Sequence, residues 1–240
     1  QWPQSVVKAL PMSDTPKTTL IGLSRQELAG LMASLGEQPF RAKQLWQWIY
    51  GRGVTDFEQM SNIAKPLREK LKESYSLARP HPSQDLQSED GTRKWLLRFT
   101  DGREVETVFI PETDRGALCV SSQVGCTLSC TFCHTGTQRL VRNLHASEII
   151  AQVMIARDRL GGWPGAARAE GTASEADAPR LITNLVFMGM GEPLANYNRV
   201  MTAIRAMVEP APNGIGMSAR GITVSTVEHL MSALAGLGID

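Results

Sequence analysis

Residues 126–133 read Cys-Thr-Leu-Ser-Cys-Thr-Phe-Cys, which places three cysteines on one short segment at C-x3-C-x2-C spacing. Three thiolates on one loop can each bind a different iron of a [4Fe–4S] cubane and leave the fourth iron without a protein ligand. That iron can chelate the amino and carboxylate groups of S-adenosylmethionine and pass one electron into its sulfonium, which releases a 5′-deoxyadenosyl radical. We therefore predict that Cys126, Cys130 and Cys133 hold one such cluster.

The alternative for this segment is a structural zinc ion, with His134 as a possible fourth ligand. Zinc sites usually combine two C-x2-C pairs that are a dozen or more residues apart, and the sequence has no second pair. All four cysteines lie between positions 119 and 133. In a reducing compartment this grouping indicates metal or redox chemistry rather than structural disulfides. The iron–sulfur interpretation is favoured.

A second motif, Gly-Met-Gly-Glu-Pro over residues 189–193, follows an apolar run from Leu181 to Met188. We expect that run to be a buried parallel strand. The two glycines let the backbone approach a ligand, and Glu192 offers a carboxylate to an ammonium or a ribose hydroxyl. In a βα sheet the ligand lies at the carboxyl ends of the strands, so this turn is expected near the cysteine segment.

Residues 1–20 lack periodicity and are expected to be a flexible tail. Residues 21–78 read as a small helical domain with a possible RNA contact, because Ser24 and Glu27 form a capping box and further helices begin near Pro39 and Lys65. Aromatic residues of the second helix, Trp46, Trp48 and Tyr50, either stack on bases or pack between the helices, and packing is favoured.

Residues 79–240 form the third predicted part. It begins with an antiparallel meander that turns at 90–91 and 101–102, both Asp-Gly. Strands and helices then alternate: a strand at 117–120, a helix capped by Ser147, a flexible loop at 161–180, a helix at 197–208, a strand at 221–226 and a helix at 229–237. This alternation predicts an α/β fold with a parallel sheet, either open or closed into a barrel.

The bulk composition is that of an ordinary soluble protein, with 42% hydrophobic and 20% charged residues. The net charge of +1 gives no sign of nucleic-acid binding, so any RNA partner must be argued from the site. No apolar run approaches the roughly 20 residues that span a bilayer, and the first residues lack the layout of a secretory signal. We expect a cytoplasmic protein with no membrane contact.

The motifs resemble those of the radical SAM superfamily, and within it a bacterial family of dual-specificity methyltransferases that modify adenine C2 in 23S rRNA and some tRNAs. The resemblance covers about residues 22–226. It rests on the segments 40–45, 105–111, 118–126, 130–133, 142–144, 189–194 and 223–226. It implies a radical SAM partial (βα) barrel, here truncated, behind the helical domain and the β meander.

The resemblance implies that one S-adenosylmethionine methylates a protein cysteine and that a second supplies the radical that activates this methyl group. The resulting carbon radical attacks adenine C2, and a second cysteine releases the product by forming a disulfide. It further implies 23S rRNA and tRNA as substrates, a reducing electron-transfer protein of the flavodoxin or ferredoxin type as partner, and a monomer.

Matched position by position, Cys119 is implied as the resolving thiol and Glu106 as the proton acceptor, while Gly191, Glu192 and Ser225 contact S-adenosylmethionine. Taken without the resemblance, Cys119 could be an ordinary buried cysteine, Glu106 a solvated strand residue and Ser225 a strand end or helix cap.

Two features depart from the family pattern. The family's methyl-carrying cysteine belongs to a C-terminal part beyond position 240, and this chain has no cysteine after Cys133. The segment 227–231, Val-Glu-His-Leu-Met, differs from the family's usual continuation, and only about three of six βα units are present. We expect a fragment that cannot complete methyl transfer alone. The remaining alternatives are a C8-directed RNA adenine methyltransferase and a non-catalytic, zinc-dependent RNA-binding module.

Overall fold

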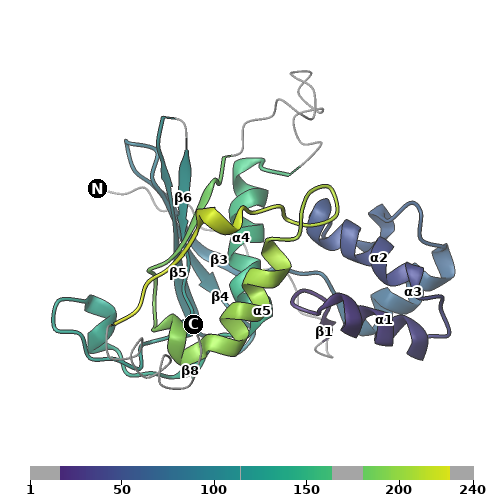
Figure 1. Ribbon diagram of the computed structural model, residues 1–240, viewed down its shortest axis with the longest axis horizontal. Helices are drawn as coiled ribbons and strands as arrows, with labels where there is room; N and C mark the ends of the chain where they lie inside the picture. Colours follow the sequence, from purple (N-terminus) through teal and green to yellow (C-terminus); the bar gives the residue numbers. More distant parts are fainter. Residues whose placement is uncertain (1–16, 114, 164–180, 228–240) are drawn as a thin grey trace.

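The computed structural model describes residues 17–113, 115–163 and 181–227, shown as coloured ribbon in Figure 1. A helical unit built from the N-terminal residues lies beside a larger unit built around one β-sheet. The predicted helix at 229–237 and nearly all of the predicted loop at 161–180 lie outside the described residues, as do residues 1–16 of the predicted tail.

Three α-helices form the N-terminal unit, and Ser24 and Glu27 make the predicted capping box at the start of the first. Leu20, inside the predicted tail, is buried, so the ordered chain begins before residue 21. The elements are β1 (Thr18–Thr19), α1 (Arg25–Ser34), α2 (Phe40–Trp46), the π-helical turn η1 (Gln47–Gly51), the 3-10 turn η2 (Phe57–Gln59), α3 (Lys65–Ser74) and β2 (Tyr75–Ser76), which pairs in parallel with β1.

The aromatic residues of the second helix pack inside this unit. Trp46, Trp48 and Tyr50 are all buried, and the rings of Trp46 and Tyr50 lie 4.2 Å apart. The Tyr50 hydroxyl accepts a hydrogen bond from the Gly22 N–H at 2.7 Å, and burial raises the tyrosine pKa well above its usual range. The packing interpretation of these aromatic residues is therefore confirmed, because buried rings offer no surface for a base.

The second unit contains a six-stranded sheet in the order β10-β9-β6-β5-β4-β3. Strands β3 to β6 pair antiparallel with their neighbours, whereas β6, β9 and β10 run parallel. Both predicted Asp-Gly turns join antiparallel neighbours. The strands are β3 (His81–Gln87), β4 (Arg93–Arg98), β5 (Glu104–Pro111), β6 (Gly116–Cys119), β9 (Asn184–Phe187) and β10 (Ile222–Val224). The described sheet is open, so the barrel-closed alternative is not seen in it.

Two helices, α4 (Ala146–Leu160) and α5 (Tyr197–Met207), lie on one side of this sheet, between it and the helical unit (Figure 1). Alternate residues of β5 show which face they cover: Val105, Thr107 and Phe109 are buried, while Glu106 is exposed. Among the described residues the opposite face is less covered, since Glu106 and Ile110 are exposed and Val108 is half-buried. No helix within the described ranges is both long and apolar enough to cross a bilayer.

The start of α4 differs from expectation. Ser147 was predicted as its cap, but the N-cap residue is His145 and Ser147 lies in the first turn. The carboxylate of Glu148, at the third helical position, accepts a hydrogen bond from the His145 N–H at 2.8 Å. The acid three residues downstream therefore satisfies the exposed amide, and the prediction of Ser147 as the cap was wrong.

The helical unit is held against the sheet unit by Arg79, in the segment before β3. Its guanidinium pairs with Asp158 of α4 at 2.8 Å and donates to the backbone oxygens of Gly53 and Val54 at 2.7 and 3.2 Å. Burial lowers the pKa of Arg79, and the charge of Asp158 opposes that shift. Trp163 packs against Gly53, where any Cβ would collide with the indole.

Candidate active site

Three parallel strands bring the sequence motifs to one edge of the sheet. The cysteine loop follows β6, the segment 189–193 follows β9, and Ser225 directly follows β10. Because β6, β9 and β10 are neighbours that run in the same direction, their carboxyl ends open at the same edge. This is where an α/β sheet binds its ligand. The structure therefore brings together segments that are up to 99 residues apart in sequence, from Cys126 to Ser225.

The cysteine loop spans residues 126–141 and is closed at its base by a two-stranded pair, β7 (Gln123–Val124) and β8 (Arg142–Asn143). Inside it, the N–H of Cys133 donates to the oxygen of Cys130 at 3.2 Å, and the Gly136 N–H donates to the oxygen of Cys133 at 3.0 Å. The 3-10 turn η3 (His134–Thr137) follows directly. Hydrogen bonds within the loop thus fix the turn that carries the last two cysteines.

All four cysteines are free thiols and partly buried. In the described part of the chain, no three His, Cys, Asp or Glu side chains form a group that could hold a metal ion. Cys126, Cys130 and Cys133 thus share one loop, but their three sulfur atoms do not converge on a single metal-ion position. As donors the three suit an iron–sulfur cubane, which takes each thiolate at a different iron.

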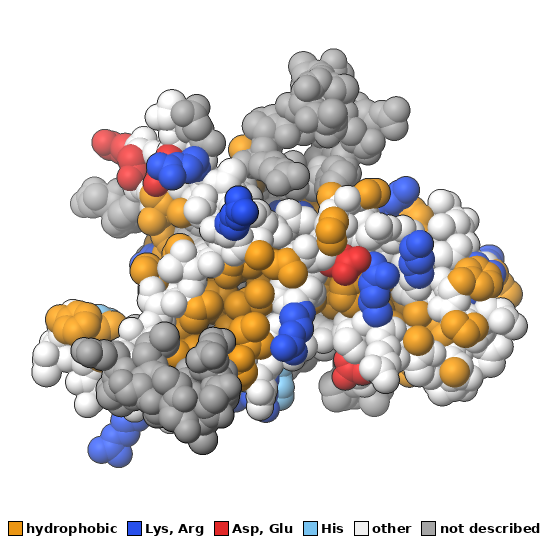
Figure 2. Space-filling view, in the orientation of Figure 1, with side chains coloured by type: hydrophobic (Ala, Val, Ile, Leu, Met, Phe, Trp, Pro, Cys, Tyr) orange, Lys and Arg blue, Asp and Glu red, His pale blue; other side chains and the backbone are white. Residues whose placement is uncertain are grey.

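The same loop carries apolar side chains into solvent. Phe132, between the second and third cysteines, is 91% exposed, and Leu140 and Val141 are about half exposed. Figure 2 shows hydrophobic atoms at the tip of the projection at the lower left, where Figure 1 shows the loop. An exposed aromatic ring beside reactive thiols is a surface on which a planar ligand can stack.

Glu192 lies buried at the edge of the sheet between β9 and β10. Its Oε1 accepts hydrogen bonds from the Leu194 N–H at 3.0 Å and from the Thr226 hydroxyl at 2.7 Å. It begins the 3-10 turn η5 (Pro193–Asn196). Its second oxygen, Oε2, takes no hydrogen bond from the described residues and so is available to a cationic or hydroxyl-bearing ligand. Nothing in the sequence indicated that Thr226, the neighbour of the predicted Ser225, bonds to Glu192.

Cys119 and Glu106 lie on the open face of the sheet. Cys119 ends β6 and pairs with Val108 of β5, two residues from Glu106, so both side chains point to the same face. Burial raises the pKa of the Cys119 thiol, a backbone hydrogen bond from Met188 opposes this, and the charge of Glu106 adds to it. Glu106 is about half exposed and pairs with Lys94 at 3.1 Å.

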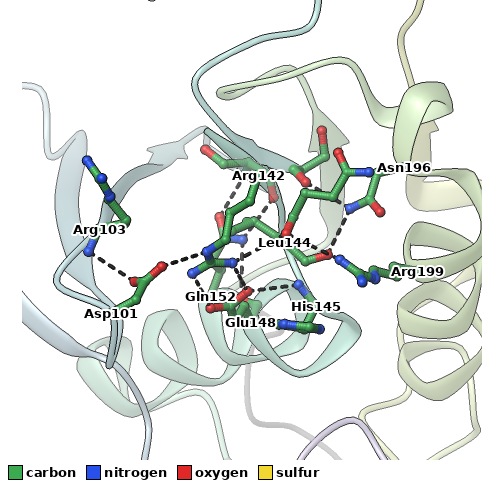
Figure 3. A network of polar contacts seen from close by, with 12 residues as sticks. Asp101, Arg103, Arg142, Leu144, His145, Glu148, Gln152, Asn196 and Arg199 are labelled. Carbon is green, nitrogen blue, oxygen red and sulfur yellow. Dashed lines mark hydrogen bonds and ion pairs between the residues drawn. The ribbon is translucent and has the colours of Figure 1, made fainter. Parts of the chain in front are cut away.

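Arg142 anchors the base of the cysteine loop to the rest of the sheet unit (Figure 3). Its two terminal nitrogens donate to both oxygens of Glu148, at 2.7 and 2.8 Å, and its Nε pairs with Asp101 at 2.6 Å. The guanidinium also lies over the ring of Phe99. These bonds raise the pKa of Arg142, Glu148 contributing most. The sequence placed Arg142 in a motif but gave it no role.

Sequence comparisons identify both units. The family model described as the ribosomal RNA large subunit methyltransferase N-terminal domain matches residues 18–77, and that of the radical SAM superfamily matches residues 120–240. The dual-specificity RNA methyltransferase RlmN of Rhodospirillum rubrum is 56% identical over 235 residues, which are 97% of this chain and 52% of that protein. RlmN of Acidiphilium cryptum is 55% identical over 92% of this chain and 55% of that protein.

A solved structure is also similar to this chain. The crystal structure of a radical SAM methyltransferase from Sphaerobacter thermophilus superposes with a TM-score of 0.75 at 38% identity, over 92% of this chain and 60% of that one. The chain belongs to the radical SAM superfamily. Within it, the N-terminal match and the named relatives place the chain in the RlmN family. It spans about half the length of those relatives.

Proposed function

We propose that the chain is part of a radical SAM methyltransferase that modifies C2 of an adenine in 23S rRNA and tRNA. The observation that supports this most is the meeting of three elements at one sheet edge: a loop with three free thiols, the buried carboxylate of Glu192, and Cys119 with Glu106 beside them. The relatives' names supply RNA as the class of substrate.

In this proposal Cys126, Cys130 and Cys133 hold one [4Fe–4S] cluster. When bound, the cluster supplies the electron that cleaves S-adenosylmethionine. Glu192, through its unoccupied oxygen, receives the ammonium or ribose of that molecule, and the absence of a side chain at Gly191 allows the approach. Ser225, partly buried beside Thr226, offers a hydroxyl at the next strand end.

Glu106 and Cys119 act on the RNA side of the proposal. The half-exposed carboxylate of Glu106 takes the proton that leaves C2, and its position on the open face leaves room for a flipped-out base. Cys119 is proposed as the resolving thiol, and the sheet face that it shares with Glu106 supports a role for both at one substrate. No cysteine follows Cys133 in the sequence, and we assign the methyl-carrying role to none of the described cysteines.

The partners follow from the same chemistry. We propose a monomer that works in the cytoplasm and receives electrons from a reduced protein of the flavodoxin or ferredoxin type. A reducing compartment keeps the thiol ligands free to bind iron. The helical unit would contact the RNA with exposed cations such as Lys43 and Arg52, the latter lying over the Trp48 ring at 4.3 Å.

Metal analysis after anaerobic purification and reconstitution tests the cluster. We expect a brown protein with iron and sulfide near four each per chain. The Cys130→Ala variant should lose the cluster, whereas Cys119→Ala should keep it, because Cys119 is placed outside the ligand set. A colourless, iron-free protein that binds zinc would overturn the proposal and favour the zinc-dependent RNA-binding module. Mass spectrometry of RNA methylated by a chain that also supplies the methyl-carrying cysteine then separates C2 from C8 methylation.

A further inference from the structure

Gln123 sits where the base of the cysteine loop meets the turn after β9. The residue belongs to β7 and is completely buried. Its Oε1 accepts hydrogen bonds from two backbone amides, those of Glu192 at 2.9 Å and Thr127 at 3.2 Å. Its Nε2 donates to the Thr127 hydroxyl and to Asn143 Oδ1, both at 2.7 Å. One side-chain amide therefore has partners on three segments.

The turn after β9 is also shaped to lie against Gln123. Gly191 has a φ of +94°, and a Cβ at that position would collide with the Cβ of Gln123. The backbone N–H of Gln123 donates to the Met190 oxygen at 3.2 Å. Close approach of the turn thus requires glycine at 191, and both the backbone and the side chain of Gln123 hold the turn in place.

The two amides that share Gln123 Oε1 belong to the two halves of the candidate site. Thr127 directly follows Cys126, the first thiol of the loop, and Glu192 carries the buried carboxylate. The acceptor and the Glu192 amide are 69 residues apart in sequence. The glutamine is completely buried, so withdrawing its side-chain amide leaves the buried Glu192 N–H without a partner, which is costly, and removes a second bond from the partly buried Thr127 N–H.

We infer that Gln123 is a positioning residue that fixes the cysteine loop relative to the Gly191–Glu192 turn. S-adenosylmethionine would then meet the cluster held by the loop and the carboxylate of Glu192 at a fixed distance from each other. This inference rests on the proposed function for the identity of the ligand. That Gln123 fixes the cysteine loop relative to the turn rests only on its hydrogen bonds, whatever the ligand is. For catalysis this means that the cysteine loop and the Gly191–Glu192 turn keep the same relative position.

The test shortens this side chain by one methylene and compares it with the same change at another buried glutamine. Gln152 of α4 is also completely buried, and its amide bonds to the backbone of Ser121 and to the Thr107 hydroxyl. The variants are Gln123→Asn and the control Gln152→Asn. Gln123→Glu is a third variant, because a carboxylate still accepts hydrogen bonds from both backbone amides.

Hydrogen exchange of the Thr127 and Glu192 amides is the first measurement. In Gln123→Asn both should exchange about five- to tenfold faster, the effect of losing a hydrogen bond worth about 1 kcal/mol. They should keep their native rates in Gln152→Asn and in Gln123→Glu. Unchanged amide exchange in Gln123→Asn, or equal acceleration in Gln152→Asn, would overturn the inference. If Gln123→Asn does not fold, loss of protection of these two amides in Gln123→Glu overturns it as well.

S-adenosylmethionine binding to the anaerobically reconstituted protein is the second measurement. Gln123→Asn should keep its iron content but bind S-adenosylmethionine about tenfold more weakly and lose the ligand-induced change in the spectrum of the reduced cluster. Gln152→Asn should keep both. Full affinity in Gln123→Asn would contradict the inference. If the unsubstituted protein holds no iron, the proposed function fails, while amide exchange still decides the role of Gln123.

Discussion

The carboxylate of Glu106 and the thiol of Cys119 lie on the same face of neighbouring antiparallel strands, and the negative charge of Glu106 raises the pKa of that thiol. Burial is the larger cause, and it acts in the same direction. Cys119 therefore stays protonated at neutral pH more than an ordinary cysteine does. A thiol in this setting is a weaker nucleophile at neutral pH than an exposed one, because less of it is thiolate.

Replacing Glu106 by glutamine should lower the pKa of Cys119, because the neutral amide no longer opposes the thiolate. At pH 8 the thiolate fraction rises, so Cys119 should be alkylated by iodoacetamide several-fold faster in Glu106→Gln. Peptide mapping by mass spectrometry measures the rate at this residue separately from the other cysteines. Lys94→Met serves as the control, since it removes the ion partner but keeps the carboxylate. An unchanged rate in Glu106→Gln would show that the two groups do not interact.

The Gly191→Ala variant should lose stability and ligand affinity together. Its Cβ meets Gln123 in a backbone conformation that side chains rarely adopt, so we expect a loss of about 2–3 kcal/mol in unfolding free energy. Gly102→Ala is the matched control, because Gly102 has a φ of +76° but open space around it. That variant should cost about 1 kcal/mol. Urea unfolding measures the unfolding free energy of both variants. Equal losses of unfolding free energy in the two would mean that the contact with Gln123 contributes nothing.

The Arg142 pairs should stabilise the base of the cysteine loop. In Arg142→Met the partly buried Glu148 loses both hydrogen bonds from the guanidinium. We therefore expect the unfolding free energy to fall by about 2 kcal/mol at pH 7. The control Arg115→Met breaks an exposed pair with Glu112 and should cost less than about 0.5 kcal/mol. Urea unfolding of the two variants gives the comparison, and similar losses would refute a structural role for Arg142.

The pH dependence of the Asp101 contribution has a definite sign. The hydrogen bond from Arg142 holds the pKa of Asp101 below its usual range. A carboxyl whose pKa is lower in the folded than in the unfolded state adds stability above the unfolded pKa, near 3.9, and loses it as pH falls through the folded value. Asp101→Asn should therefore cost about 0.5 kcal/mol at pH 7 and nothing near pH 2, measured by urea unfolding. A constant difference would contradict this.

Arg79 should hold the helical unit in place. The Arg79→Met variant removes the pair with Asp158 and the bonds to the backbone of Gly53 and Val54, and we expect a loss of about 3 kcal/mol. Arg98→Met removes an exposed pair with Glu104 and should cost less than about 1 kcal/mol. Limited proteolysis between residues 77 and 81 should accelerate only in Arg79→Met. Equal proteolysis in both variants would exclude this role.

Local signals in the sequence located most elements. The capping box of Ser24 and Glu27, the Asp-Gly turns and the alternation of β4 and β5 are all present in the structure. These features depend on residues within a few positions of each other, so they can be read without the fold. The start of α4 could not be placed so well, because two polar residues, His145 and Ser147, compete for a cap that Glu148 decides.

The cysteine spacing by itself predicted the class of the site and, with the other motifs, led to the family, because three thiols at C-x3-C-x2-C lie within one loop whatever surrounds it. The tertiary structure alone decided what holds that loop. Gln123 meets Glu192 because the parallel strands β6 and β9 end side by side, and Arg142 meets Asp101 because β8 lies beside the turn between the antiparallel strands β4 and β5. Neither pair leaves a pattern in the sequence, since a buried amide and a strand-end arginine look like any other polar residue until their partners are known.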